Sequence, residues 1–147
     1  MVLVHDISRR LYNYMKVLRI VFALSMGILG GVLLAQTEGD FSNWMKQVAK
    51  SNGALKGAVA AKDAKAVATE AKALDTAFAS VEAYFKSHNM TDAEGMAKTV
   101  HANTTKLATA AAAGTIDEAA ATAVGGSCAG CHSAHREKGA DGAYKIK

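Results

Sequence analysis

Two cysteines and a histidine near the end of this 147-residue chain have the spacing of a haem-attachment site. Cys128, Cys131 and His132 form the pattern C-x-x-C-H. In this pattern each thiol can add across one vinyl group of a haem, and the adjacent imidazole can ligate the iron. Only 15 residues follow His132, so a second axial ligand is expected from upstream. The motif predicts one haem c, bound covalently through both cysteines.

Three other interpretations of the motif are weaker. A zinc site would need Cys128, Cys131, His132 and His135 to act together from one short segment, whereas structural zinc sites usually combine ligand pairs from separate segments. A thioredoxin-like C-x-x-C normally follows a strand in a βαβ unit, and the sequence has no strand pattern here. A structural disulfide would suit an exported protein, but it gives His132 no role.

The N-terminal 35 residues have the layout of a secretory signal peptide. Lys16 and Arg19 precede an uncharged run over residues 20–35, with a candidate cleavage point at its end. Residues 1–14 are interpreted as an upstream start or a long leader, which would make Met15 the true start. The alternative is an uncleaved membrane anchor, although a spanning helix needs roughly 20 residues. Both interpretations predict export, to the periplasm of a bacterium.

Most of the chain's positive charge lies in this leader. The whole chain has a net charge of +4, but residues 36–147 hold 13 basic and 12 acidic residues and are nearly neutral. They contain no basic patch interleaved with aromatic residues, so nucleic-acid binding is not expected. Their length and their alanine-rich, proline-free composition favour a single helical domain.

Hydrophobic periodicity predicts an all-α domain in residues 36–147. Apolar residues recur every three or four positions, as on one face of a helix. Asp40 is a suitable N-cap for the first helix, and capping boxes at Thr91 and Thr115 are expected to begin the third and fourth. The tail after residue 138 is expected to be loose. The four expected helices cover about residues 40–60, 63–87, 91–113 and 115–138.

Apolar stripes identify the residues that are expected to face the core. The most regular stripe, on the second helix, is formed by Val67, Ala71, Leu74, Phe78, Val81 and Phe85. The stripe of the first helix is formed by Phe41, Trp44, Met45, Val48, Leu55 and Val59. The stripe of the third helix is formed by Met96, Val100, Asn103, Leu107 and Ala110.

Short connections make consecutive helices antiparallel neighbours, which predicts an up-down-up-down four-helix bundle. A small cytochrome of irregular topology would carry the motif near its start and a methionine far downstream, the reverse of the order here. In the bundle, the end of the fourth helix lies beside the starts of the first and third helices and the end of the second. The expected haem pocket at this level is formed by Phe41, Met45, Val48, Val81, Phe85, Met96 and Val100.

Of the residues at this height in the bundle, only Met45 and Met96 have a sulfur atom that could ligate the iron. Met45 is favoured as the metal ligand opposite His132 because it comes from the first helix, although methionine in a bundle often only fills the core. His88 and His101 are interpreted as solvated surface residues.

Several residues around the motif could contact the rest of a haem. Arg136, one helical turn beyond His132, is expected to bind a haem propionate. His135 lies near the same face and is interpreted as a partly exposed bystander that could also reach a propionate. Gly125 and Gly126 weaken a helix and would let its backbone approach the macrocycle.

The segment from Val124 to His132, with Arg136 one turn later on the last of four helices, resembles the cytochrome c′ family, the class II c-type cytochromes. The resemblance covers about residues 40–138. Its specific part is the C-x-x-C-H-x-x-x-R ending, and the rest matches in pattern only. The resemblance implies that Cys128 and Cys131 anchor haem c and that His132 is the proximal ligand.

The family position on the distal side of the iron, which Met45 matches, separates two functions. Relatives with methionine there are six-coordinate electron carriers, whereas members with leucine or an aromatic residue are typically five-coordinate and bind small gases. Members often have arginine one turn earlier, where this chain has Phe41, and many form homodimers. The expected function is electron transfer with unidentified redox partner proteins, not enzymatic catalysis. Binding of NO or CO is the alternative.

Overall fold

The computed structural model describes residues 36–140, 142 and 144–147. The proposed signal peptide or anchor, residues 1–35, lies outside the described residues. Among the described helices, none is long and apolar enough to cross a membrane. The elements, in chain order, are α2 (Glu38–Ala60), α3 (Ala64–Ser87), α4 (Thr91–Ala112), α5 (Glu118–His135), β1 (Arg136–Lys138) and β2 (Tyr144–Ile146).

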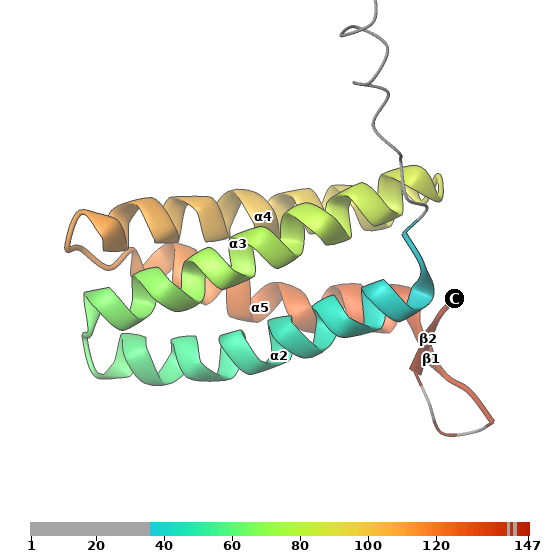
Figure 1. Ribbon diagram of the computed structural model, residues 1–147, viewed down its shortest axis with the longest axis horizontal. Helices are drawn as coiled ribbons and strands as arrows, with labels where there is room; N and C mark the ends of the chain where they lie inside the picture. The colour runs from blue at the N-terminus through green and yellow to red at the C-terminus, as the bar shows by residue number, and fades with distance from the viewer. Residues whose placement is uncertain (1–35, 141, 143) are drawn as a thin grey trace, which may run out of the picture. The chain divides into compact units, whose positions relative to one another are not determined.

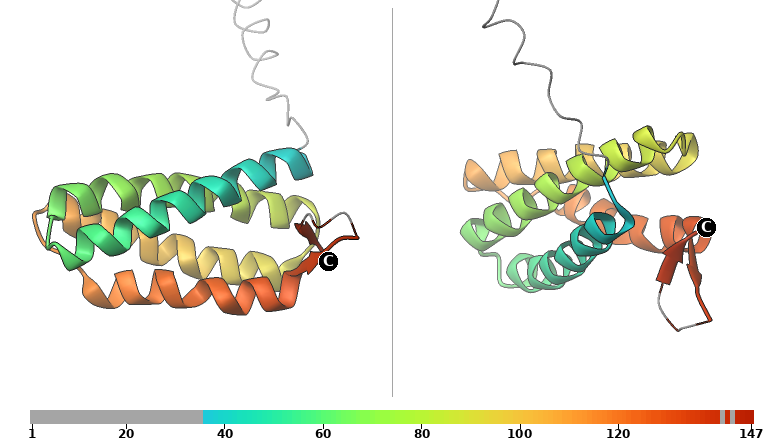
Figure 2. Two further views of the ribbon diagram at one scale, coloured as in Figure 1. Left: turned by 90° about the horizontal axis from the view of Figure 1, so that it is seen from below. Right: turned by 45° about the vertical axis from the view of Figure 1, so that its right-hand side comes forward.

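The four helices pack in sequence order, as in an up-down bundle (Figure 1). The most extensive packing joins α3 to α4, whereas α2 and α5 touch each other only sparsely. The start of α2, the turn between α3 and α4, and the end of α5 lie at the same end of the bundle, together with the strands (Figures 1 and 2). The sequence-based prediction of four sequentially packed helices is therefore confirmed.

The helix starts differ in detail from the sequence prediction. Thr37, not Asp40, is the N-cap of α2, and Asp40 completes a capping box by accepting a hydrogen bond from the Thr37 amide. Thr91 lies inside α4, whose N-cap Met90 makes no side-chain cap hydrogen bond. The N-cap of α5 is Asp117, whose carboxylate accepts from the Ala120 amide. The predicted boxes at Thr91 and Thr115 are therefore wrong, because the helix starts are shifted by one or two residues.

The core lies between the helices and is built mainly from α3. All six residues of the stripe predicted for this helix are buried, from Val67 to Phe85. The stripe predicted for α4 is only partly right, because Val100 and Leu107 are buried but Met96 is 38% exposed. Alanine is apolar enough for the core and small enough for close helix packing, so the buried face of α4 is rotated toward its alanines. That face is formed by Ala93, Ala97, Val100, Thr104, Leu107 and Ala111.

The C-terminal tail forms a β-hairpin, which corrects the expectations of a loose tail and of a fourth helix reaching Lys138. The helix ends at His135 because Arg136 takes an extended conformation. Strand β1 then pairs antiparallel with β2, with Arg136 opposite Ile146. The Arg136 guanidinium carbon lies 3.9 Å from the centre of the Tyr144 ring, a cation–π contact that holds the strands together. The Lys147 amide also donates to the His135 carbonyl.

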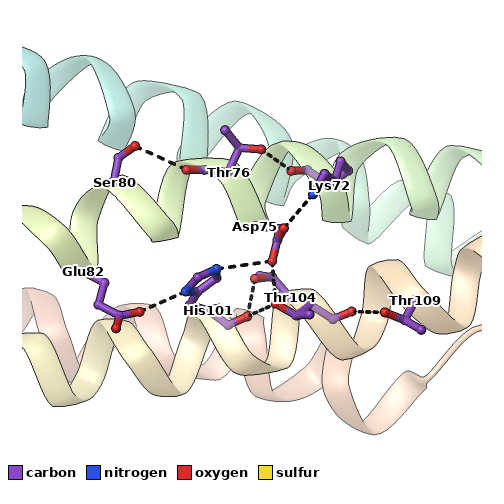
Figure 3. A network of polar contacts seen from close by, with 9 residues as sticks. Lys72, Asp75, Thr76, Ser80, Glu82, His101, Thr104 and Thr109 are labelled. Atoms are coloured by element: carbon purple, nitrogen blue, oxygen red, sulfur yellow. Dashed lines mark hydrogen bonds and ion pairs between the residues drawn. The ribbon is translucent and has the colours of Figure 1, made fainter. Parts of the chain in front are cut away.

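A polar cluster joins α3 to α4 on the flank of the bundle (Figure 3). The imidazole of His101 lies between two carboxylates, with Nδ1 2.9 Å from Glu82 Oε2 and Nε2 3.4 Å from Asp75 Oδ1. Asp75 also accepts hydrogen bonds from Thr105 and Lys72. The interpretation of His101 as a solvated surface residue is therefore wrong, since its side chain is 29% exposed and bridges two helices.

Candidate cofactor site

A cavity of about 690 Å³ lies at the end of the bundle that carries the hairpin. Its volume is within the range of small-molecule and cofactor sites, roughly 300–1,000 Å³. Residues of all four helices and of both strands line it. The structure brings all nine sequence-predicted site residues to this cavity: Phe41, Met45, Val48, Phe85, Met96, Cys128, Cys131, His132 and Arg136.

The α5 wall of the cavity holds the C-x-x-C-H motif. Positions three and four apart share one face of a helix, so Cys128, Cys131 and His132 all line the cavity. Both cysteines are free thiols of intermediate burial. The buried residues of α5 are Ala120 and Val124, both before the motif. The later turns of α5 therefore face the cavity instead of the core.

Burial shifts the ionisation of two motif residues, Cys131 and His132. Burial raises the pKa of the Cys131 thiol, with smaller contributions from Cys128 and the Asp92 carboxylate. A reactive or metal-binding cysteine needs the opposite shift. Burial, and then the charge of Arg136, lowers the pKa of His132, which favours the neutral imidazole that can ligate a metal.

The α2 wall is apolar around Met45. Met45 and Phe41 are half-buried and Val48 is buried. The Phe41 ring packs with its centroid 4.8 Å from that of Tyr84 and 5.3 Å from that of Phe85. This wall therefore presents an aromatic cluster, which offers no charge to a bound carboxylate.

Met96 and Arg136 also line the cavity, whereas the two predicted glycines do not. Met96 lines it from α4 but remains partly exposed. Arg136 lines it from β1, with its guanidinium over the Tyr144 ring. Gly125 and Gly126 do not line it, and a side chain added at either would meet nothing closer than Lys56 Cε at 4.0 Å. The expectation that these glycines bring the backbone up to a macrocycle is therefore not supported by their position.

Two contributions to the cavity were not predicted from the sequence. His135 is not a partly exposed bystander, because its side chain is only 10% exposed and lines the cavity. The hairpin adds Tyr144, Lys145 and Ile146. The alternation of Tyr144 and Ile146 is the one period-two signal that could have indicated a strand, and it is very short. His88, by contrast, is exposed and lies outside the cavity lining, as expected.

The arrangement fits a flat apolar cofactor with two attachment points. Two half-buried thiols, an imidazole and a thioether line one cavity, and the buried Nε2 of His135 has no hydrogen-bond partner within the protein. Within the described residues, no three His, Cys, Asp or Glu side chains gather as a metal-binding cluster. The geometry therefore does not favour a zinc module built from the motif.

Comparisons with protein-family models, with curated proteins and with solved structures found no significant match to this chain.

Proposed function

We propose that the chain is a c-type cytochrome that carries one covalently attached haem and transfers single electrons. The observation that carries the proposal is the shared cavity: Cys128, Cys131 and His132 line it from α5, and Met45 lines it from α2. Each residue type has a role in haem attachment or iron ligation. Their meeting in one apolar cavity is the arrangement that this function requires.

Different residues would hold different parts of the cofactor. The thiols of Cys128 and Cys131 would form the two thioether links, and His132 would supply the proximal nitrogen as a neutral imidazole. Met45 would supply the distal sulfur. When bound, haem iron exchanges one electron between its ferric and ferrous states, and His/Met ligation raises its reduction potential. Phe41, Val48, Phe85 and the other apolar side chains would exclude water from the group.

The chain would be exported to the bacterial periplasm, where it would exchange electrons with redox partner proteins. It would act as a carrier rather than an enzyme, either as a monomer or as the homodimer that its family resemblance suggests. It would attach to a membrane only if residues 1–35 were retained as an anchor.

Gas binding is the second candidate function, and the apolar α2 wall is the observation that favours it. If Met45 only packs against this wall, the distal side of the iron would be a hydrophobic site next to Phe41 and Val48. A small neutral gas such as NO or CO could bind there.

A potentiometric titration of the purified, haem-loaded protein, followed by absorbance, tests the proposal. We expect one reversible transition with the slope of a one-electron couple, about 59 mV per tenfold change in the ratio of the two forms. We also expect a low-spin ferrous spectrum that CO does not alter. A high-spin spectrum with rapid CO binding would contradict electron transfer and favour gas binding as the function. Absence of haem would overturn both candidates.

A further inference from the structure

His135 carries a buried ring nitrogen that makes no hydrogen bond within the protein. It is the last residue of α5, and its side chain is 10% exposed. Its Nε2 is buried and has no hydrogen-bond partner. Buried polar atoms in folded proteins are nearly always paired, so each exception calls for an explanation. Because His135 lines the cavity, a ligand in the cavity can supply the missing partner.

The nearest charged group does not supply that partner. Asp92 Oδ2, at the start of α4, lies 3.3 Å from His135 Nε2. This contact satisfies the distance for an ion pair, but Nε2 still makes no hydrogen bond. The Asp92 side chain is 74% exposed, so its carboxylate lies largely outside the cavity wall that His135 forms. The other close neighbour is the Phe85 ring, 6.4 Å away between centroids, which contributes packing only.

Arg136, the residue expected from the sequence to bind a propionate, is placed differently. It lies beyond the end of α5 in extended backbone, so it no longer continues the helical face that holds His132. Its guanidinium already stacks on Tyr144, and the residue is exposed. At this end of α5, His135 is therefore the side chain whose buried ring nitrogen lacks a hydrogen bond.

We propose that His135 Nε2 donates a hydrogen bond to a carboxylate of the cavity's ligand, which makes His135 the buried propionate anchor of the haem. This inference rests on the proposed function, because it takes the ligand to be a haem. Its chemical basis is the complementarity between an unpaired imidazole nitrogen and the acid groups of an otherwise apolar macrocycle. His135 is a binding and orienting residue, distinct from the iron ligand His132.

Resonance Raman spectroscopy of the haem-loaded protein tests the inference, because propionate bending modes respond to hydrogen bonds at the carboxylate. His135→Phe keeps a planar ring beside Phe85 and removes both nitrogens. His135→Gln keeps a donor at nearly the same reach. His88→Phe is the matched control, since His88 lies outside the cavity lining. We expect the propionate band to shift in His135→Phe and to keep its parent position in His135→Gln and His88→Phe.

The outcomes separate this inference from the proposed function. Covalent haem in the parent with an unshifted band in His135→Phe would overturn the role of His135 alone. A parent protein without covalent haem would overturn the proposed function and the inference with it. If His135→Phe does not fold, ring ¹⁵N–¹H correlation spectra of the parent in its diamagnetic ferrous state test the hydrogen bond of His135 Nε2 instead. A His135 Nε2 proton that exchanges more slowly than that of His88 supports the bond, and an unprotonated Nε2 contradicts it.

Discussion

Met45 on α2 and His132 on α5 line one cavity, although their two helices touch each other only sparsely. Helices that follow one another in sequence contact each other more extensively than α2 contacts α5. The cavity is therefore lined by the two helices whose mutual packing is sparse. A thioether from one wall and an imidazole from the other are the two axial ligands of many electron-transfer haem proteins.

The first prediction concerns Met45. Met45→Leu nearly preserves the side-chain volume, so it should cost less than about 1.5 kcal/mol of folding stability. If Met45 ligates the iron, the same change should convert the spectrum from low to high spin, lower the reduction potential and allow CO to bind. Met96→Leu, in the same cavity but on α4, is the control and should leave the spectrum unchanged. A parent-like spectrum for Met45→Leu would assign Met45 to packing and favour gas binding.

The second prediction compares two threonines that differ in their capping role. Thr37→Ala removes the capping box of α2 and should lower the free energy of unfolding by about 0.5–2 kcal/mol. Thr91→Ala is the control, because Thr91 caps nothing in the structure and is exposed on α4. Urea unfolding of both variants measures the difference. A larger loss for Thr91→Ala would show that α4 begins at the predicted capping box after all.

The sequence predicted the helices better than their ends. The α3 stripe was correct because it alternates large apolar residues with polar ones, so its inner face is unambiguous. The α4 stripe was only partly right because alanine is common on both faces of that helix and carries little information about burial. The hairpin was missed because Glu137 and Lys138 are good helix formers, and its two strands are stabilised by contacts distant in sequence, such as Arg136 with Tyr144.

The candidate site was predictable where the motif or the helix register fixed it. The C-x-x-C-H spacing identifies Cys128, Cys131 and His132 without a structure. The level of Met45 follows from counting residues along antiparallel helices. The burial of His135 depends on the point at which α5 ends and on what the hairpin covers, so no local pattern could indicate it. The bridging role of His101 depends likewise on the pairing of two helix flanks.

The third prediction concerns acid stability and the Asp75 cluster. Burial alone would raise the pKa of Asp75, but hydrogen bonds from Thr105 and Lys72 and the charges of Lys72 and His101 outweigh it and lower the pKa from its ordinary value of 3.8. A carboxylate with a lowered folded-state pKa stabilises the fold above its unfolded-state pKa, and this contribution is lost as the pH falls through the folded-state pKa. The Asp75 contribution should therefore be complete at neutral pH and should decline below about pH 4.

Comparison with Asp75→Asn measures this contribution. The difference in unfolding free energy between the parent and Asp75→Asn should be constant near neutral pH and should shrink on acidification below 3.8, the ordinary value for this group. The exposed aspartate Asp92 provides the control substitution Asp92→Asn, for which no comparable loss is expected because its side chain is 74% exposed. A parent-to-variant difference for Asp75→Asn that does not change with pH would contradict the account.

The mass of the intact polypeptide under denaturing conditions tests the central claim most directly. The protein should be produced in a bacterial host that has a c-type cytochrome maturation system. We predict that the parent polypeptide carries the added mass of one haem and that the double variant Cys128→Ala with Cys131→Ala carries none. Ser127→Ala, next to Cys128 in the same cavity wall, should retain the added mass. A parent polypeptide without this mass, produced beside a control cytochrome that acquires it, would contradict the claim that this cavity is a haem site.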